Sequence, residues 1–200
     1  MIKNNLLKEL RMKYFPLIAI AFFLITGCDR TYTPKPRGYF RIDLPEKQYV
    51  KFDTTYPYTF EYPSYAKILY DNRPGSEPYW INIDYPKFKG RIHISYKPVH
   101  GNLVEYLEDS RTFVLKHIPK ADAIDDSLIY RPQDHVYGLT YYIGGTGAAS
   151  PCQFFVTDSS SHFLRAALYF NVTPNNDSLA PVIQYIEEDI RHMIATFRWK

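Results

Sequence analysis

Apolar and polar residues alternate along several stretches of the chain, between segments rich in proline, glycine and asparagine. Within residues 79–85, for example, Ile81 and Ile83 fall on one side of an extended backbone and Asn82 and Asp84 on the other. This two-residue period is typical of strands in a sheet with one buried face. The pattern predicts strands at 39–45, 58–62, 79–85, 91–96, 123–130, 135–144, 153–157 and 163–171.

A first helix is predicted after Asn102. Asn102 and Glu105 are spaced as in a capping box, and Pro119 marks the expected end of the helix. The apolar positions that recur at helical spacing between them are Leu103, Tyr106, Leu107, Val114 and Ile118.

A second helix is predicted at the end of the chain. Asp177 or Ser178 is expected to cap it, and Pro181 suits its first turn. Its apolar stripe consists of Val182, Ile186, Ile190, Met193 and Phe197. The charged and polar positions that we expect to face water are Glu187, Glu188, Asp189, Arg191 and His192.

Strands, a helix, further strands and a final helix predict an α+β fold, in which an antiparallel sheet is packed with two helices. Turns are expected at 86–90 and at 158–161, the second one inside a hairpin. Residues 39–200 are expected to form a single domain. Residues 28–38 are polar and contain Pro34 and Pro36, so they predict an extended tether before that domain.

Residues 1–27 have the features of an export signal. Basic residues precede an apolar run, from Tyr14 to Thr26, that is short for a bilayer span. The run ends in Ile25-Thr26-Gly27-Cys28, which resembles the bacterial lipobox. This resemblance implies cleavage before Cys28 and acyl chains, such as palmitate, on its sulfur and on the new amino terminus. Because two or more acyl chains anchor a protein stably, we expect an exported lipoprotein in the inner or outer membrane of the cell envelope. An ordinary secretory signal with a chance cysteine is the alternative.

Removing the leader changes the charge balance. The chain has 24 Lys and Arg against 21 Asp and Glu, and residues 1–27 hold four of the basic residues but only one acid. Residues 28–200 therefore carry equal numbers of each. Nucleic-acid binding needs a surplus of clustered Lys and Arg, so no nucleic-acid partner is expected. With Cys28 lipidated, Cys152 has no second cysteine to pair with.

Motifs that indicate catalysis or metal binding are weak. The small residues from Gly144 to Ser150 resemble a phosphate cradle but lack the Lys-Ser or Lys-Thr of a P-loop, which favours a flexible loop. Whether that loop binds anything stays open. Cys152 is expected to be a buried, inert thiol, and the DSSSH at 158–162 is expected to form a turn. The histidines show no metal-ligand spacing, and His93 is expected to face solvent. We therefore expect no enzyme activity, no metal and no cofactor.

The segment next to the tether combines basic and aromatic side chains. Arg37, Tyr39, Phe40 and Arg41 surround Gly38. Arginine and aromatic residues are frequent anchors of protein interfaces, so these residues are candidates for partner binding. A first strand whose arginines extend to solvent is the alternative.

Several motifs, in their order, resemble one known family. They are the lipobox cysteine, PKPRGYFRIDLP at 34–45, FEYP at 60–63, WINIDYP at 80–86 and FFVTDSSSHFLRAALYFN at 154–171. Together they resemble the gliding motility lipoprotein GldD of Bacteroidetes-type gliding bacteria. The resemblance implies an envelope lipoprotein required for gliding and associated with the motility apparatus and the linked type IX secretion system. The order of elements also resembles the Mog1/PsbP-like α/β/α sandwich, which implies nothing about activity.

The residues and the resemblance favour a non-enzymatic component or adaptor that acts by contact. Its expected partners are other gliding or secretion proteins of the envelope and the membrane itself, with no small-molecule substrate. Two alternatives stay open. A deep polar pocket with paired carboxylates would favour an enzyme acting on peptidoglycan or glycans. Exposed tyrosines clustered in a groove would favour a glycan or small-ligand binder.

Overall fold

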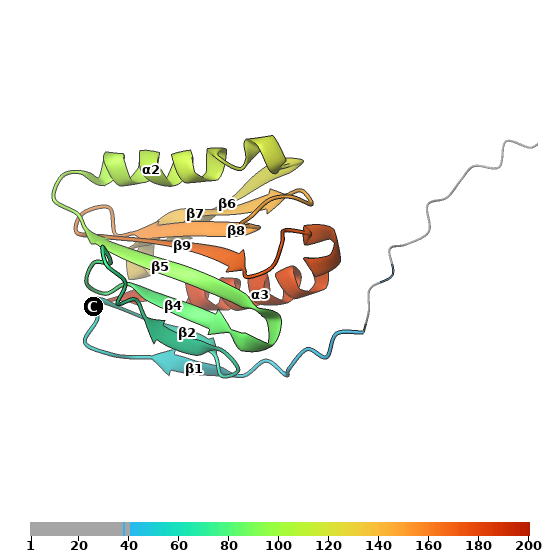
Figure 1. The fold of residues 1–200 in the computed structure, drawn as a ribbon. Helices are drawn as coiled ribbons and strands as arrows, with labels where there is room; N and C mark the ends of the chain where they lie inside the picture. The colour runs from blue at the N-terminus through green and yellow to red at the C-terminus, as the bar shows by residue number, and fades with distance from the viewer. Residues whose placement is uncertain (1–37, 39–40) are drawn as a thin grey trace, which may run out of the picture. The chain divides into compact units, whose positions relative to one another are not determined.

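A computed structural model of the chain describes Gly38 and residues 41–200, with a seven-stranded antiparallel sheet at its centre (Figure 1). The strand order is β3–β4–β5–β9–β8–β7–β6. These strands are β3 (Lys67–Tyr70), β4 (Ile81–Tyr85), β5 (Gly90–Pro98), β6 (Ala123–Arg131), β7 (Val136–Gly144), β8 (Cys152–Thr157) and β9 (His162–Phe170). The leader, Cys28 and the candidate residues Arg37, Tyr39 and Phe40 lie outside the described residues.

A smaller, three-stranded sheet lies beside the large one. It has the order β1–β2–β10, with β1 at Tyr49–Phe52, β2 at Tyr58–Pro63 and β10 at Arg198–Trp199. Both pairings are antiparallel, and they join the first described strand to the last residues of the chain through β2. The beginning and the end of the described domain therefore share one sheet.

One helix packs on each face of the large sheet (Figure 1). Helix α2 (Leu103–Leu115) packs through Leu103, Tyr106 and Leu107 on the side that contains Phe155 and Phe163. Helix α3 (Asn176–Thr196) covers the opposite face. The main core lies between α3 and the two sheets; its residues include Tyr58, Phe60, Ile83, Ile92, Leu164, Leu168, Ile186 and Ile190. This arrangement confirms the α+β class with antiparallel sheets and two helices.

The strand alternation is confirmed where it is strongest. Ile81 and Ile83 of β4 and Ile92 and Ile94 of β5 face the α3 side and are buried there. The antiparallel register places Ile83 opposite Ile92, so the apolar side chains of neighbouring strands meet in rows. Each intervening residue points to the face on which α2 packs.

The predicted strand at 39–45 is wrong for its described part. Residues 41–48 form no strand, and β1 begins only at Tyr49. Side-chain contacts fix this segment instead: Ile42 packs against the main core, and the carbonyl oxygen of Pro45 accepts a 2.6 Å hydrogen bond from Tyr185. Pro45 has no backbone N–H for a ladder, which is why an extended but unpaired backbone suits it.

Both helix caps differ from the prediction. The side chain of Asn102 accepts a hydrogen bond from the backbone N–H of His100 and makes no capping bond to α2. Helix α2 ends at Leu115, and Ile118–Lys120 form a separate 3-10 turn. Helix α3 is capped by Asn175, whose side chain accepts from the N–H of Ser178, so Pro181 lies beyond the first turn.

Gly138 of β7 provides a test of the sheet packing. A Cβ atom at Gly138 would lie 1.9 Å from the carbonyl oxygen of Phe155 on β8, a contact that only backbone movement can relieve. We expect Gly138→Ala to lower the free energy of unfolding by roughly 3 kcal/mol. At Gly144 the nearest atom would be 3.7 Å away, so Gly144→Ala is the control, with a change below about 0.5 kcal/mol. Urea unfolding measures the free energy of unfolding of both variants, and equal losses would contradict the close approach of Gly138 to β8.

Candidate functional site

The carboxylate of Asp189 is buried, which corrects the prediction that it faces water. Its residue is only 1% exposed. Asp189 follows Ile186 by three residues and precedes Met193 by four, so helical spacing places it within the apolar stripe of α3. The helical spacing alone places Asp189 in the apolar stripe, whereas the prediction that it faces water rests on its charge.

Three side chains from the N-terminal part of the domain donate hydrogen bonds to Asp189. Lys47 Nζ lies 2.7 Å and the Tyr49 hydroxyl 3.0 Å from Oδ1. The Tyr65 hydroxyl lies 2.7 Å from Oδ2. Burial and the charge of Asp189 raise the pKa of Tyr49 far above its usual value, and burial with the neighbouring Tyr185 and Asp189 does the same for Tyr65. Both tyrosines therefore keep their protons and remain donors at neutral pH.

Further contacts extend this cluster along α3. Lys47 Nζ also donates to the carbonyl oxygen of Tyr185 and lies 3.6 Å from the centroid of its ring, a cation–π contact. The Tyr49 ring stacks on His192 with centroids 3.6 Å apart, and His192 bonds Glu61 of β2 at 2.7 Å. We call Lys47, Tyr49, Tyr65 and Asp189 the attachment cluster, because they attach the start of the domain to its last helix.

The attachment cluster is suited to holding the chain and unsuited to acid–base chemistry. Both carboxylate oxygens of Asp189 already accept bonds from protein groups. Because Asp189 is buried and both of its oxygens accept hydrogen bonds from protein groups, the carboxylate is held in place away from solvent and from any substrate.

Among the predicted partner-binding residues, Arg41 is the one that the structure describes. Its side chain is exposed, and it forms no ion pair with any carboxylate of residues 41–200. Next to it, Asp43 bonds Lys87 of the β4–β5 turn at 2.8 Å. Arg41 therefore lies on an exposed backbone whose following residues are fixed to the domain.

The loop from Gly144 to Ser150 is packed and is no phosphate cradle. The Nδ2 of Asn176 donates to the carbonyl oxygens of Gly145 and Ala148, both at 2.9 Å. Gly145 has φ +125°, and a Cβ there would lie 2.6 Å from the carbonyl oxygen of Lys120. The loop thus directs carbonyl oxygens, which repel phosphate, to the start of α3.

Cys152 is buried, as predicted, and burial raises the pKa of its thiol far above the usual range, so the thiol stays protonated and unreactive.

The DSSSH segment forms the predicted turn between β8 and β9. The Oδ1 of Asp158 accepts from the backbone N–H groups of Ser160, Ser161 and His162. These side chains therefore serve the fold.

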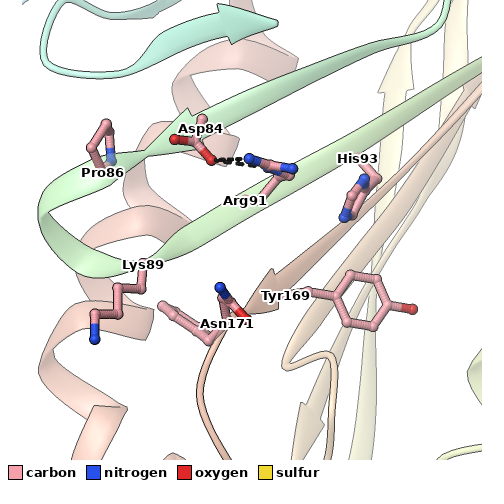
Figure 2. A pocket seen from close by; sticks show the side chains of 8 residues that line it. Asp84, Pro86, Lys89, Arg91, His93, Tyr169 and Asn171 are labelled. Carbon is pink, nitrogen blue, oxygen red and sulfur yellow. Dashed lines mark hydrogen bonds and ion pairs between the residues drawn. The ribbon is translucent and has the colours of Figure 1, made fainter. Parts of the chain in front are cut away.

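A polar pocket lies over β4, β5 and β9 of the large sheet (Figure 2). Its volume is about 660 Å³, and its lining consists of Asp84, Pro86, Lys89, Arg91, His93, Tyr169, Phe170 and Asn171. His93 lies on the polar side of its strand, as predicted, but its side chain is half-buried beside Tyr169, with ring centroids 5.7 Å apart, where a plain solvent position was expected. No motif marked the pocket, because its residues come together only through the strand register.

Comparison with protein families identifies the chain. A family model described as gliding motility lipoprotein GldD matches residues 29–199. The chain belongs to the GldD family. This membership confirms the expected family and a gliding motility lipoprotein, and it implies association with the cell envelope. The match begins directly after Cys28.

Other comparisons add little about the role of this GldD-family chain. A comparison with curated proteins finds no match. Among solved structures, the chain is similar to the cyanobacterial PsbP protein (CyanoP) from Synechocystis sp. PCC 6803, with 10% identity, a TM-score of 0.45, and 80% of this chain and 98% of that chain covered. Within the part of the chain that the structure describes, no helix has the length and apolarity to cross a bilayer.

Replacement of Asp189 tests the attachment cluster of this GldD-family chain. Asp189→Ala removes the acceptor that Lys47, Tyr49 and Tyr65 share and leaves Lys47 without its buried counter-charge, so we expect the free energy of unfolding to fall by roughly 3–5 kcal/mol. Hydrogen exchange of residues 45–52 should accelerate more than that of β9. Glu188→Ala removes the adjacent, exposed carboxylate and is the control, with a loss below about 1 kcal/mol. Similar losses in both variants would contradict the cluster's role.

Asp158 predicts a pH dependence of stability. Burial opposes the ionised form, but the backbone N–H groups of Ser160, Ser161 and His162 outweigh it and lower the pKa of Asp158 to about 2. Because this value lies below the ordinary one, the contribution is complete above about pH 4 and is lost as the pH falls through about 2. The side chain is partly exposed, so we expect a contribution of about 1 kcal/mol.

Asp158→Asn keeps an acceptor but loses the charge. It should lower the free energy of unfolding by about 1 kcal/mol at pH 7 and flatten the fall between pH 4 and 2. Asp125→Asn, on the exposed strand β6, is the control and should leave the profile unchanged. Urea unfolding across this pH range measures the effect, and an unaltered acid limb in Asp158→Asn would contradict the assignment.

Proposed function

We propose that this GldD-family lipoprotein is a lipid-anchored, non-enzymatic adaptor of the gliding apparatus and the linked type IX secretion machinery. The observation that carries the proposal is the attachment cluster, which fixes the residues directly after the tether to the last helix of the domain. A chain anchored at Cys28 by acyl chains such as palmitate, after removal of a signal peptide, would transmit that attachment to the membrane. Anchoring also raises the effective concentration of the domain near membrane partners.

The chemistry of the described side chains supports a role without catalysis. Asp189 has its acceptors occupied, Cys152 is buried with a raised pKa, and Asp158 is committed to a turn. In the pocket, Asp84 is the single carboxylate of the lining and is paired with Arg91. Glycoside hydrolysis uses two carboxyl groups across the scissile bond, so the pocket favours ligand binding over cell-wall hydrolysis.

Arg41 and its neighbours are the proposed contact with partner proteins. Arg41 is exposed without a carboxylate partner in residues 41–200, and Leu44 is 38% exposed three residues later. An unpaired arginine beside apolar surface has the composition of an interface hot spot. Arg37, Tyr39 and Phe40 precede it in the sequence and are proposed to belong to the same contact.

The proposal predicts a loss of motility without a loss of stability. In a gliding host, Arg37→Ala combined with Arg41→Ala should reduce spreading on a surface and the yield of crosslinked envelope partners. The melting temperature should change by less than about 2 °C, because Arg41 is exposed and forms no hydrogen bond or ion pair with residues 41–200. Lys67→Ala combined with Arg111→Ala removes the same charge from other exposed positions and is the control.

The anchor is tested in the same strain. Cys28→Ser should leave the domain folded but abolish acylation, so both motility and partner crosslinking should fall. Wild-type motility in the Arg37 and Arg41 double variant, or a melting temperature that falls with motility, would contradict the proposed contact. Turnover of peptidoglycan by the purified lipoprotein would contradict the non-enzymatic role.

A further inference from the structure

The pocket on the large sheet is built from aligned rows of side chains. The register places Asp84 of β4 opposite Arg91 of β5, and Arg91 opposite Tyr169 of β9. These positions alternate with Ile83, Ile92 and Leu168, which are buried beneath α3. The row therefore points to the other face of the sheet, where Figure 2 shows the side chains around one hollow.

The β4–β5 turn adds a second cation. Pro86–Phe88 form a 3-10 turn, after which Lys89 adopts a left-handed conformation with φ 51°. The backbone oxygen of Lys89 accepts from the N–H of Asn171 at 2.8 Å, which brings the end of β9 to the same rim. The Lys89 ammonium forms no ion pair with any carboxylate among the described residues.

Arg91 retains donors after its pairing with Asp84. Its Nε and Nη2 both contact the single oxygen Oδ1, at 2.9 Å and 2.7 Å. The Nη1 group has no acceptor among residues 41–200. With Lys89 unpaired and Arg91 only partly engaged, the lining holds two basic side chains against one carboxylate. That balance favours an anionic group on the ligand.

The remaining polar lining is neutral. Burial, with the nearby charges of Arg73 and Arg91, lowers the pKa of His93, so at neutral pH its ring offers one donor and one acceptor. The Asn171 amide also supplies both kinds of group. A ligand rich in hydroxyl groups matches such mixed donors and acceptors.

Ring surfaces complete the lining. Pro86 and Tyr169 bring apolar ring carbons to the same pocket. Sugars present C–H groups on one face and hydroxyls around the edge, so they suit a site that combines ring carbons with neutral donors and acceptors. The pocket volume of about 660 Å³ also falls within the range of small-ligand sites.

We propose that this pocket binds an anionic saccharide, a sugar acid or a sugar phosphate, with Lys89 and Arg91 contacting the acid group and His93 and Asn171 bonding its hydroxyls. This role goes beyond the adaptor function and does not depend on it. Asp84 orients Arg91 and accepts a hydroxyl through its second oxygen.

Calorimetric titration of the full mature lipoprotein in neutral detergent tests the proposal. The probes are glucuronate, glucose 6-phosphate, unmodified glucose and inorganic phosphate. Glucuronate and glucose 6-phosphate should bind with dissociation constants of about 1 mM or tighter, and glucose and inorganic phosphate at least about tenfold more weakly.

Two lysines of one turn give a matched pair of variants. Lys89→Gln removes the unpaired cation of the pocket and should weaken glucose 6-phosphate by about tenfold. Lys87→Gln removes a lysine that is outside the pocket lining and bonds Asp43, so it should change affinity less than about twofold. Equal melting temperatures show that both variants are folded.

Each opposite result counts against a stated part of the proposal. Absence of heat from glucuronate and glucose 6-phosphate up to about 20 mM would exclude the site. Equal affinity for glucose would remove the anionic requirement, and equal affinity for inorganic phosphate would remove the sugar. Equal losses in Lys87→Gln and Lys89→Gln would place binding outside this pocket. None of these results bears on motility, so they leave the adaptor proposal standing.

Discussion

A single buried carboxylate, Asp189, organises the first part of the domain. Lys47 and Tyr49 precede the large sheet and Tyr65 follows β2, yet all of them donate to this one side chain of α3. Taking a carboxylate out of water is costly unless ionised and hydrogen-bonded partners surround it. The helix can therefore keep Asp189 in its apolar stripe only while the N-terminal segment is seated. The carboxylate is therefore buried at the same step of folding at which the N-terminal segment packs on α3.

This dependence has a consequence for a lipid-anchored protein. A pull on the segment before β1 first reaches Ile42, which packs against the main core, and Asp43, which bonds Lys87. The carbonyl oxygen of Pro45 and the ammonium of Lys47 come next, and both are bonded to α3, through Tyr185 and Asp189. The small sheet follows these residues along the chain, and its strand β2 also pairs with β10 at the end of the chain. Force on the tether is thus distributed to the last helix and the last strand, instead of separating β1 from β2 alone.

The pattern of apolar and polar residues predicts the long alternating strands and both helices, because their periods extend over many residues. Strands β1, β3 and β10 were not predicted, because segments of four, four and two residues carry no readable period. Asp189 was predicted to face water because it is charged, although its position in the helix lies within the apolar stripe of α3. The pocket could not be foreseen, since Arg91 and Tyr169 meet only when two strands distant in sequence pair in one register. That register depends on how the apolar rows pack, which residue type alone does not encode.

The β4–β5 turn connects the two proposed surfaces. Lys87 of this turn bonds Asp43, two residues after Arg41, and the ring of Phe88 lies edge-on to Tyr185, with centroids 5.7 Å apart. Lys89, the next residue, lines the pocket. A ligand acid group drawn to Lys89 would act on a turn that already contacts both the exposed segment at Arg41 and the helix that holds the attachment cluster. Coupling between ligand and partner contact would require an element that borders both surfaces, and the contacts of Lys87 and Lys89 place this turn between them.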